Sequence, residues 1–310
     1  MKKMKNLKIL ITGGAGFIPG SLAAKLAKDT SNFIVVVDNF LTGKKKNIPQ
    51  GDNIRFIKCD VNHYLEIAPI MTSHQFDYVF HYAAVVGVKR TLANPAMVLE
   101  DLSGIKNILG LCKNTGVKRV FYSSSSEVYG EPVELPQHEE TTPLNSRLPY
   151  AIVKNAGEAY CKAFKQEYDL DYTIFRFFNT YGPLQSTDFV MSKFIKAALR
   201  NDPITIYGDG SQTRTFCYID DNIDFTSRCM FEDIYVNDVV NVGNDEQTTI
   251  LELAQIIIEE SNSTSKIEFL PPLGEGDMTR RQPDIEKMRS SLSRDLLDMR
   301  SGIRLLLKQF

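Results

Sequence analysis

Short apolar runs alternate with longer segments of helical periodicity through the first half of the chain. The runs rich in β-branched and aromatic residues predict strands at 8–12, 33–38, 54–59, 78–81, 120–123 and 172–177. Apolar residues at helical spacing predict helices at 20–28, 64–71, 95–115 and 149–168. This alternation indicates right-handed βαβ crossovers and a parallel sheet covered by helices on both faces. We therefore expect an α/β fold, a Rossmann-type doubly wound parallel sheet that binds ligands at the carboxyl ends of its strands.

The pattern is less regular in the second half. It predicts helices at 189–200, 220–231, 250–261 and 303–308, and strands at 204–207 and 239–242. Gly208-Asp-Gly210 predicts a turn, and Pro271-Pro272 begins a loop rich in glycine and proline. We expect residues 1–180 to form the doubly wound domain, rejoined by about 215–243. Residues 181–310 would then form a smaller substrate-binding lobe.

Composition narrows the possible classes of protein. Of the 310 residues, 43% are hydrophobic and 24% are charged, which is ordinary for a globular chain with a core. The net charge of −2 argues against a nucleic-acid partner. The five cysteines and four histidines show no metal-ligand spacing, so we expect no metal and reduced thiols in a cytoplasmic protein. No apolar run reaches the roughly 20 residues of a membrane helix, so we expect no membrane partner.

A glycine-rich segment joins the first predicted strand to the first predicted helix. In Ile9-Leu-Ile-Thr-Gly13-Gly-Ala-Gly16-Phe-Ile-Pro19-Gly20, Gly13 would supply the tight turn. Gly16 would let the backbone approach a pyrophosphate at the positive end of the helix. The strand–loop–helix setting favours a dinucleotide site over a purely structural turn.

Acidic residues follow the next two predicted strands. Asp38 ends Ile34-Val-Val-Val-Asp38, about twenty residues beyond the glycine-rich loop. A carboxylate there accepts hydrogen bonds from the adenosine ribose and repels a 2′-phosphate, which favours NAD over NADP. Asp60 and Val61 follow the third strand and are expected to meet the adenine.

A tyrosine and a lysine lie four residues apart in Tyr150-Ala-Ile-Val-Lys154, and so share one face of a helix. An ammonium beside a phenol favours the phenolate and lowers its pKa, which makes a base usable near neutral pH. The run Ser123-Ser-Ser-Ser126-Glu127 ends the preceding strand. A serine hydroxyl from that run would complete the proton path.

Together the motifs resemble those of the extended short-chain dehydrogenase/reductases, in the NAD-dependent nucleotide-sugar epimerase/dehydratase family. The residues of these motifs are most similar to those of the UDP-glucuronate decarboxylases. The motifs that carry the resemblance are Gly13 and Gly16 of the glycine pattern, His81-Tyr-Ala-Ala84, Ser124-Ser-Ser-Glu-Val-Tyr-Gly130, Tyr150 with Lys154, Phe178-Asn-Thr-Tyr-Gly-Pro183, Tyr207-Gly-Asp-Gly-Ser-Gln-Thr-Arg-Thr-Phe216 and, more weakly, Thr279-Arg-Arg-Gln-Pro-Asp284.

The resemblance implies roles for individual residues. Tyr150 would take the proton of the sugar 4-hydroxyl while NAD accepts hydride from C4, and Lys154 would keep Tyr150 ionised. Ser125 would be the relay serine, with Ser124 as the fallback, and Glu127 would act at C5. Tyr150 and Lys154 would also contact the cofactor, Lys154 at the nicotinamide ribose. The remaining cofactor contacts would be Phe17, Ile18, Asn39, Ala83, Ala84 and Ser123. The substrate contacts would be Ser125, Ser126, Asn179 and Arg214, the last two at the diphosphate.

The chain departs from the family pattern at several positions. Pro19 replaces the third glycine of the pattern. Proline is accepted in the first turn of a helix. Asp101 stands where asparagine is common, which puts a cofactor-side hydrogen bond in doubt. Leu184 replaces an arginine, which puts the substrate of the decarboxylases in doubt. Ser126 replaces the aspartate of the dehydratases and is a weaker acid, so loss of water from C6 is not expected.

The sequence leaves the outcome open among decarboxylation, 4-epimerisation and release of a 4-keto sugar. The alternative from another class is a catalytically idle NAD-binding regulatory protein on the same fold. The resemblance also implies a homodimer, in which helices 95–115 and 149–168 pair into a four-helix bundle. Their apolar residues fit either a core alone or a core plus an interface: Met97, Ile105, Ile108, Ala159 and Phe164.

Overall fold

The computed structural model describes residues 6–272 and 281–309, which divide into two compact units. Among these residues, the first unit comprises 6–128, 146–177 and 223–240. The second unit comprises 129–145, 178–222 and the described residues from 241 onward. Thr279 and Arg280 of the weakest sequence motif, and most of the expected glycine- and proline-rich loop, lie outside the described residues.

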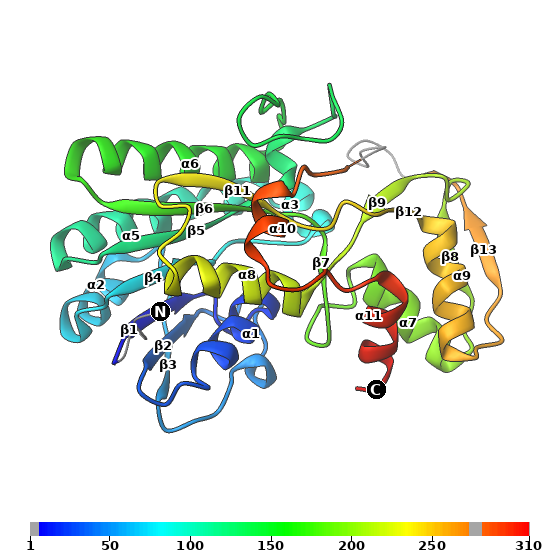
Figure 1. Cartoon of the computed structure of the whole chain (residues 1–310), viewed down its shortest axis with the longest axis horizontal. Helices are drawn as coiled ribbons and strands as arrows, with labels where there is room; N and C mark the ends of the chain where they lie inside the picture. Colours follow the sequence, from blue (N-terminus) through cyan, green and yellow to red (C-terminus); the bar gives the residue numbers. More distant parts are fainter. Residues whose placement is uncertain (1–5, 273–280, 310) are drawn as a thin grey trace. The chain divides into compact units, whose positions relative to one another are not determined.

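The first unit is built on a seven-stranded sheet in the order β11-β6-β5-β4-β1-β2-β3 (Figure 1). The pairs from β6 through β3 are all parallel. The strand order reverses between β1 and β4, as in a doubly wound fold, so the predicted fold class is confirmed. The strands are β1 Lys8–Thr12, β2 Phe33–Asp38, β3 Ile54–Lys58, β4 Tyr78–His81, β5 Arg119–Ser125, β6 Asp171–Phe177 and β11 Asp238–Val242.

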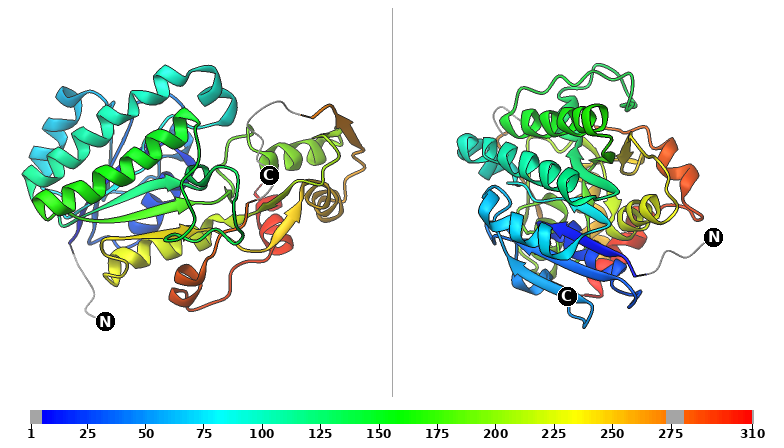
Figure 2. Two further views of the ribbon diagram at one scale, coloured as in Figure 1. Left: turned by 90° about the horizontal axis from the view of Figure 1, so that it is seen from above. Right: turned by 90° about the vertical axis from the view of Figure 1, so that its left-hand side faces the viewer.

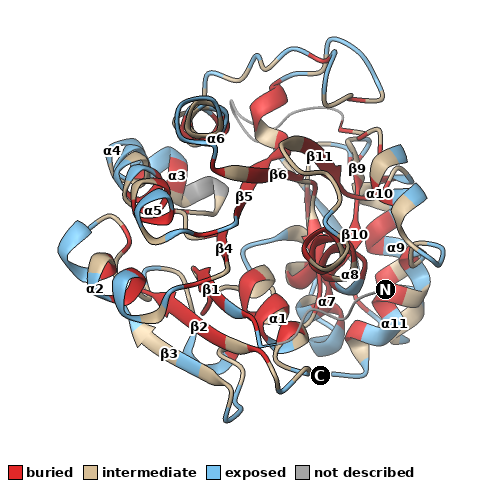
Figure 3. Cartoon of the chain, turned by 60° about the vertical axis from the view of Figure 1, so that its left-hand side comes forward, coloured by how far each residue is buried: buried red, intermediate tan, exposed pale blue. Residues whose placement is uncertain are grey.

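Helices cover both faces of this sheet. On one face lie α2, α5 and α6, and α5 and α6 run side by side (Figures 2 and 3). On the other lie α1 and the part of α8 that belongs to this unit (Figure 3). The helices and 3₁₀ turns that lie wholly or partly in the unit are α1 Phe17–Leu26, η1 Lys45–Asn47, α2 Tyr64–His74, α3 Val88–Ala93, α4 Pro95–Leu99, α5 Asp101–Thr115, η2 Ser126–Tyr129, α6 Pro149–Tyr168 and α8 Ile219–Phe231.

Each face of the sheet has its own apolar layer. Aliphatic side chains fill the face under α2, α5 and α6, with Leu10, Val35 and Ile108 fully buried. The face toward α8 is aromatic: Phe121 stacks on Phe80, with ring centroids 4.4 Å apart, and Phe175 continues the layer. The burial of both faces explains why the strands read as continuous hydrophobic runs.

Several predicted boundaries differ from the structure. The helix expected over 95–115 is two helices, α4 and α5, preceded by α3. β5 continues two residues past the expected 120–123, so Ser124 and Ser125 belong to the strand. α1 begins at Phe17 rather than at residue 20, because Gly16 already stands as its N-cap.

In its described residues, the second unit contains three two-stranded sheets and several helices. β8 pairs with β13 in parallel, beside α7 and α9, and β9 pairs with β12 antiparallel. Among the described residues its elements are β7 Thr180–Tyr181, α7 Val190–Arg200, β8 Ile204–Tyr207, β9 Thr213–Thr215, β10 Cys217–Tyr218, β12 Gln247–Thr249, α9 Ile250–Ser261, β13 Ile267–Leu270, α10 Glu286–Ser291 and α11 Met299–Leu307.

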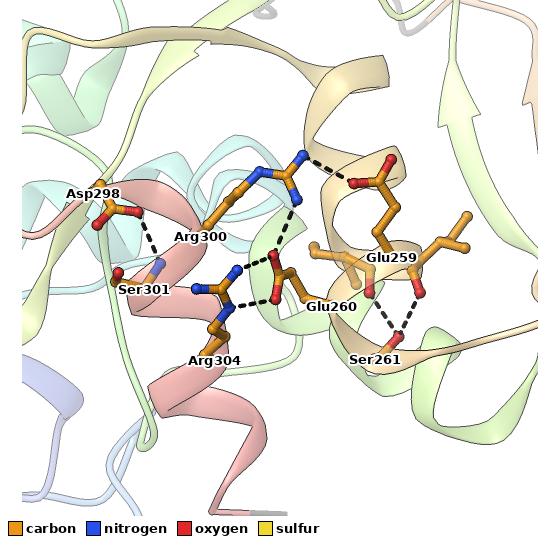
Figure 4. Close-up of polar contacts among 9 residues, drawn as sticks. Glu259, Glu260, Ser261, Asp298, Arg300, Ser301 and Arg304 are labelled. Carbon is orange, nitrogen blue, oxygen red and sulfur yellow. Dashed lines mark hydrogen bonds and ion pairs between the residues drawn. The ribbon is translucent and has the colours of Figure 1, made fainter.

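Ion pairs join the last helix, α11, to α9 (Figure 4). Arg300 donates to Glu259 and Glu260 at 2.9 and 3.0 Å, and Arg304 donates to both oxygens of Glu260. Asp298 caps α11 by accepting from the Ser301 N–H at 2.9 Å. These contacts explain why α11 starts at residue 299 rather than at the predicted 303, since the cap precedes the apolar run.

Candidate active site

The loop between β1 and α1 has almost no room for side chains. Gly13 adopts a φ of +70°, and a Cβ there would lie 2.8 Å from the Ala83 Cα. A Cβ on Gly14 would lie 2.0 Å from Cγ1 of Val36, and one on Gly16 2.9 Å from the Gly13 carbonyl oxygen. The result is bare backbone leading into the positive end of α1, which fits a pyrophosphate. The sequence did not identify the need for Gly14, because Val36 belongs to another strand.

Proline at position 19 fits the helix that follows this loop. Pro19 is the third residue of α1, where the N–H would have no helical partner. The close helix contact falls one position later, since a Cβ on Gly20 would lie 2.5 Å from the Asn47 carbonyl oxygen. Asn47 also donates its side-chain amide to the Ala15 carbonyl at 3.2 Å, which braces the loop from the side.

Asp38 lies at the end of β2, beside the glycine-rich loop. The residue is 8% exposed, and its carboxylate accepts from the Ala15 N–H at 3.0 Å and the Phe40 N–H at 2.7 Å. Burial raises the pKa of this carboxyl, and the two hydrogen bonds oppose the shift. The carboxylate is thereby held beside the pyrophosphate cradle, which is the place for a ribose contact.

The segments after β2 and β3 are tied together. Asn39 donates its amide to Asp60 at 2.9 Å, and the other Asp60 oxygen accepts from the Asn62 N–H at 2.9 Å. Val61 is buried, and its carbonyl accepts from Asn107 of α5 at 2.9 Å. The structure therefore brings the expected adenine-side residues to one edge of the sheet.

Lys154 is buried against the end of β5. Its Nζ donates to the Ser123 carbonyl at 2.7 Å and to the Ser123 hydroxyl at 3.2 Å. The same nitrogen lies 5.7 Å from the centroid of the Tyr150 ring and 5.2 Å from that of Tyr122. Burial lowers the pKa of Lys154 to about 8, and the charge of Asp101 opposes this shift. The ammonium is thus fixed between the strand and the tyrosine ring.

The end of β5 presents the remaining catalytic candidates. Ser125 is the last residue of the strand, and its hydroxyl accepts from the Glu127 N–H at 3.2 Å. Ser126 and Glu127 follow in η2. Side chains alternate along a strand, so Ser123 and Ser125 share a face and Ser124 points to the other. The Ser124 hydroxyl donates to Glu158 at 2.5 Å, which commits the fallback serine to a different contact.

Asp101 begins α5, with its side chain turned toward the segment after β4. Its Oδ2 accepts from the Val85 N–H at 2.7 Å and its Oδ1 from Asn62 at 3.5 Å. Burial raises the pKa of Asp101, while the Val85 hydrogen bond and the charge of Lys154 lower it. An asparagine at position 101 would be neutral. Asp101 instead carries a charge, which raises the pKa of Lys154.

Two expected substrate contacts belong to the second unit. Asn179 donates its amide to the Thr215 carbonyl at 3.0 Å. Arg214 lies on β9, opposite Thr248 of β12, and donates to the Thr213 carbonyl at 2.8 Å. Asn179 therefore holds the segment that carries Arg214, a structural role that the sequence did not indicate.

No cluster of three or more His, Cys, Asp or Glu side chains that would hold a metal ion occurs within 6–272 and 281–309. All five cysteines are free and buried. Over the same described ranges, every helix is too short or too polar to span a membrane.

The strand order, the glycine loop at the point of reversal and the acidic end of β2 define a dinucleotide-binding α/β protein. The sequence profile of the NAD dependent epimerase/dehydratase family matches residues 9–243, and the chain belongs to this family. The family and the NAD cofactor expected from the motifs are confirmed.

Curated relatives are similar over nearly the whole chain. UDP-glucuronic acid decarboxylase 4 of Arabidopsis thaliana is 35% identical, over 99% of this chain and 69% of its own length. A UDP-N-acetyl-alpha-D-glucosaminuronate decarboxylase of Bacillus cytotoxicus is also 35% identical, over 91% of this chain and 90% of its own.

Solved structures share the fold. The UDP-glucose 4-epimerase of Thermotoga maritima, with UDP-glucose, has a TM-score of 0.92 and 30% identity, covering 98% of both chains. The UDP-glucuronic acid 4-epimerase of Bacillus cereus, with UDP-glucuronic acid and NAD, has a TM-score of 0.88 and 29% identity, covering 98% of this chain and 99% of its own.

Proposed function

We propose that this protein oxidises a nucleoside-diphosphate sugar at C4, with NAD, to a 4-keto sugar. The observation that carries the proposal is the buried Lys154, hydrogen-bonded to Ser123 and placed beside the Tyr150 ring. An idle binding protein has no need of an ammonium held beside a tyrosine, and burying one is costly. The names of the relatives support a UDP-sugar as the substrate.

The side chains divide the chemistry among them. NAD, when bound, supplies the hydride acceptor. Tyr150 takes the proton from the C4 hydroxyl, and the Lys154 ammonium favours the phenolate that does so. Ser125, at the end of β5, relays the proton. The glycine loop and Asp38 hold the cofactor, and in the second unit Asn179 and Arg214 are proposed to contact the diphosphate.

The first candidate fate of the 4-keto sugar is decarboxylation. A carboxylate on C5 stands β to a C4 ketone, so the C5 bond to the carboxylate can break with its electrons passing into an enolate. Glu127, in η2 directly after the relay serine, is the residue proposed to act at C5. The two decarboxylases at 35% identity support this fate.

The second candidate fate is 4-epimerisation, which the likeness to the 4-epimerases supports. Here the ketone is reduced again on its other face, and no carbon is lost. Leu184 stands where the family pattern has an arginine, so the charge on C5 of the substrate is the property to test first.

A product panel tests the proposal. Purified protein is mixed with UDP-glucuronic acid, UDP-N-acetylglucosaminuronic acid or UDP-glucose, and the sugar nucleotides are separated by chromatography that resolves 4-epimers before mass spectrometry, beside absorbance near 340 nm. Loss of 44 mass units indicates decarboxylation, and an epimer of unchanged mass indicates epimerisation. Tyr150→Phe is the control and should lower C4 oxidation at least about a hundredfold. No product and no absorbance change with any of the three sugars would favour the idle NAD-binding protein.

We also propose a homodimer formed through α4, α5 and α6. Ile105 and Ile108 are buried inside the unit and belong to its core. Leu99 on α4 and Ile152 on α6 are 44% and 47% exposed, which leaves apolar surface on these helices for a second copy. Light scattering at micromolar concentration should give twice the 35.0 kDa chain mass, and a monomer would contradict the proposal.

The five free, buried cysteines support a reducing compartment, and we propose that the protein is cytoplasmic. We propose the first unit as the NAD-binding domain and the second unit as the nucleotide-sugar domain. Compared with the expected boundaries of 1–180 and about 215–243, the second unit also includes 129–145, and the segment that rejoins the first unit is 223–240.

A further inference from the structure

A buried ion pair lies directly behind the catalytic end of β5. Glu158 of α6 and Arg176 of β6 have side chains only 1% and 3% exposed. Arg176 donates Nε to one carboxylate oxygen at 2.9 Å and Nη2 to the other at 2.7 Å. Ser124 of β5 donates its hydroxyl to the first of these oxygens at 2.5 Å. Three elements therefore meet at one carboxylate.

The contacts fix where α6 sits along β5. Lys154 and Glu158 are four residues apart, so they share one face of the helix. Lys154 bonds to Ser123 and Glu158 to the next residue, Ser124. Arg176 is the direct register partner of Ser124 on β6, so the ion pair also joins the two strands.

A buried ion pair of this kind is weak evidence for a role in stability. Removing two charges from water is costly, and well-packed apolar residues of similar volume often serve a fold as well or better. A bidentate arginine–carboxylate pair has fixed geometry, which an apolar contact lacks. The pair contacts Ser124, which lies between Ser123, the partner of Lys154, and the relay serine Ser125. Small displacements at this place matter for proton transfer.

We propose that Glu158 and Arg176, acting through Ser124, are positioning residues for C4 oxidation. They hold the end of β5 against α6, so that Lys154 and Ser125 keep the geometry that the proton transfer to Tyr150 requires. The inference deepens the proposed function and rests on it.

The test uses variants that spare the proposed catalytic residues. Glu158→Leu with Arg176→Met removes both charges together, which avoids leaving a lone buried charge. Ser124→Ala leaves the ion pair and removes only its link to the strand. The control is Asp233→Asn, which removes the charge of one exposed partner of another buried arginine, Arg119, at the opposite end of β5. Arg119 keeps its hydrogen bonds to the Cys229 and Ile234 carbonyls.

Four quantities are measured for each protein: bound NAD, KM for the sugar nucleotide, the single-turnover rate near 340 nm and hydrogen exchange at residues 123–127. We expect the double variant to keep its NAD and its KM within about twofold, while hydride transfer slows at least about tenfold, as for a misplaced reacting group. Ser124→Ala should slow it at least about threefold, again at constant KM. Exchange at 123–127 should speed up in both, and the control should match wild type.

Wild-type rates and wild-type exchange in Ser124→Ala would overturn the inference, whatever happens to the melting temperature. If the double variant does not fold, Ser124→Ala decides alone. If wild type transfers no hydride from any sugar, the proposed function fails instead, and exchange at 123–127 still decides whether the pair holds the end of β5.

Discussion

The hydroxyl of Thr12, at the end of β1, lies 2.9 Å from Nδ1 of His81, at the end of β4. The same oxygen accepts the N–H groups of Tyr82 and Ala83, each at 3.0 Å. With its acceptor sites occupied, the hydroxyl gives its own proton to His81, whose Nδ1 must therefore be the acceptor. Burial, with the nearby Lys154 charge, lowers the pKa of His81 to about 3, which agrees with a neutral ring. One threonine thus joins the two strands at the point where the cofactor loop begins.

This junction makes Thr12→Val informative. The valine keeps the shape and removes the hydroxyl, so the Tyr82 and Ala83 N–H groups and one ring nitrogen lose their partner. Because Gly13 lies against Ala83, we expect the pyrophosphate loop to lose its shape and NAD affinity to fall at least about tenfold, measured by titration. Thr12→Ser keeps the hydroxyl and should bind NAD nearly as wild type. Equal affinity in both variants would show that the junction does not shape the loop.

Asp38 should make the site select NAD. A carboxylate beside the adenosine ribose repels the extra phosphate of NADP, so NADP should bind at least about tenfold more weakly. Asp38→Asn removes the charge and should narrow that difference, chiefly by weakening NAD. Titration of both cofactors against both proteins checks this, and tighter binding of NADP by wild type would show the role of Asp38 to be wrong.

The rate of C4 oxidation should fall at alkaline pH, because Lys154 loses its proton there. Because its pKa is lowered to about 8, the ammonium dominates below pH 8 and is lost as the pH rises through that value. The groups around it are the Asp101 carboxylate, the neutral His81, and the rings of Tyr122 and Tyr150. We expect kcat/KM for C4 oxidation to decline above about pH 8.

Asp101→Asn tests whether the titration of Lys154 causes this alkaline decline in kcat/KM. The charge of Asp101 raises the pKa of Lys154, so the substitution should move the decline to lower pH. Asp233→Asn removes a carboxylate that pairs with Arg119 at the opposite end of β5, and it should leave the pH profile unchanged. Superimposable profiles for wild type and Asp101→Asn would mean that Asp101 does not act on Lys154.

Glu127→Gln distinguishes the fates of the 4-keto sugar. If Glu127 acts at C5, hydride transfer should persist while a 4-keto sugar and NADH accumulate, read by product mass and single-turnover absorbance. A simple 4-epimerase should keep its epimer ratio, and a solvated glutamate should change the rate by no more than a few-fold. Full conversion to a decarboxylated product in Glu127→Gln would exclude the C5 role.

The sequence by itself determined the sheet, the cofactor and the family. The apolar runs of β1, β2 and β4 could be read directly because strands buried on both faces must be hydrophobic throughout. Gly13, Gly16 and Asp38 were also readable, since backbone approach and ribose contact each restrict one position to few residue types. These signals are local and need no knowledge of what lies opposite.

The tertiary structure decided which neighbours those residues meet. The short strands β9 and β12 pair across more than thirty residues, and neither has a periodic pattern of its own. The requirement at Gly14 comes from Val36, and the commitment of Ser124 comes from Glu158. The sequence shows four serines in a row. Only the packing of α6 along β5, which places Lys154 and Glu158 one helical turn apart beside the strand, assigns the Ser123 carbonyl and hydroxyl to Lys154 and the Ser124 hydroxyl to the ion pair.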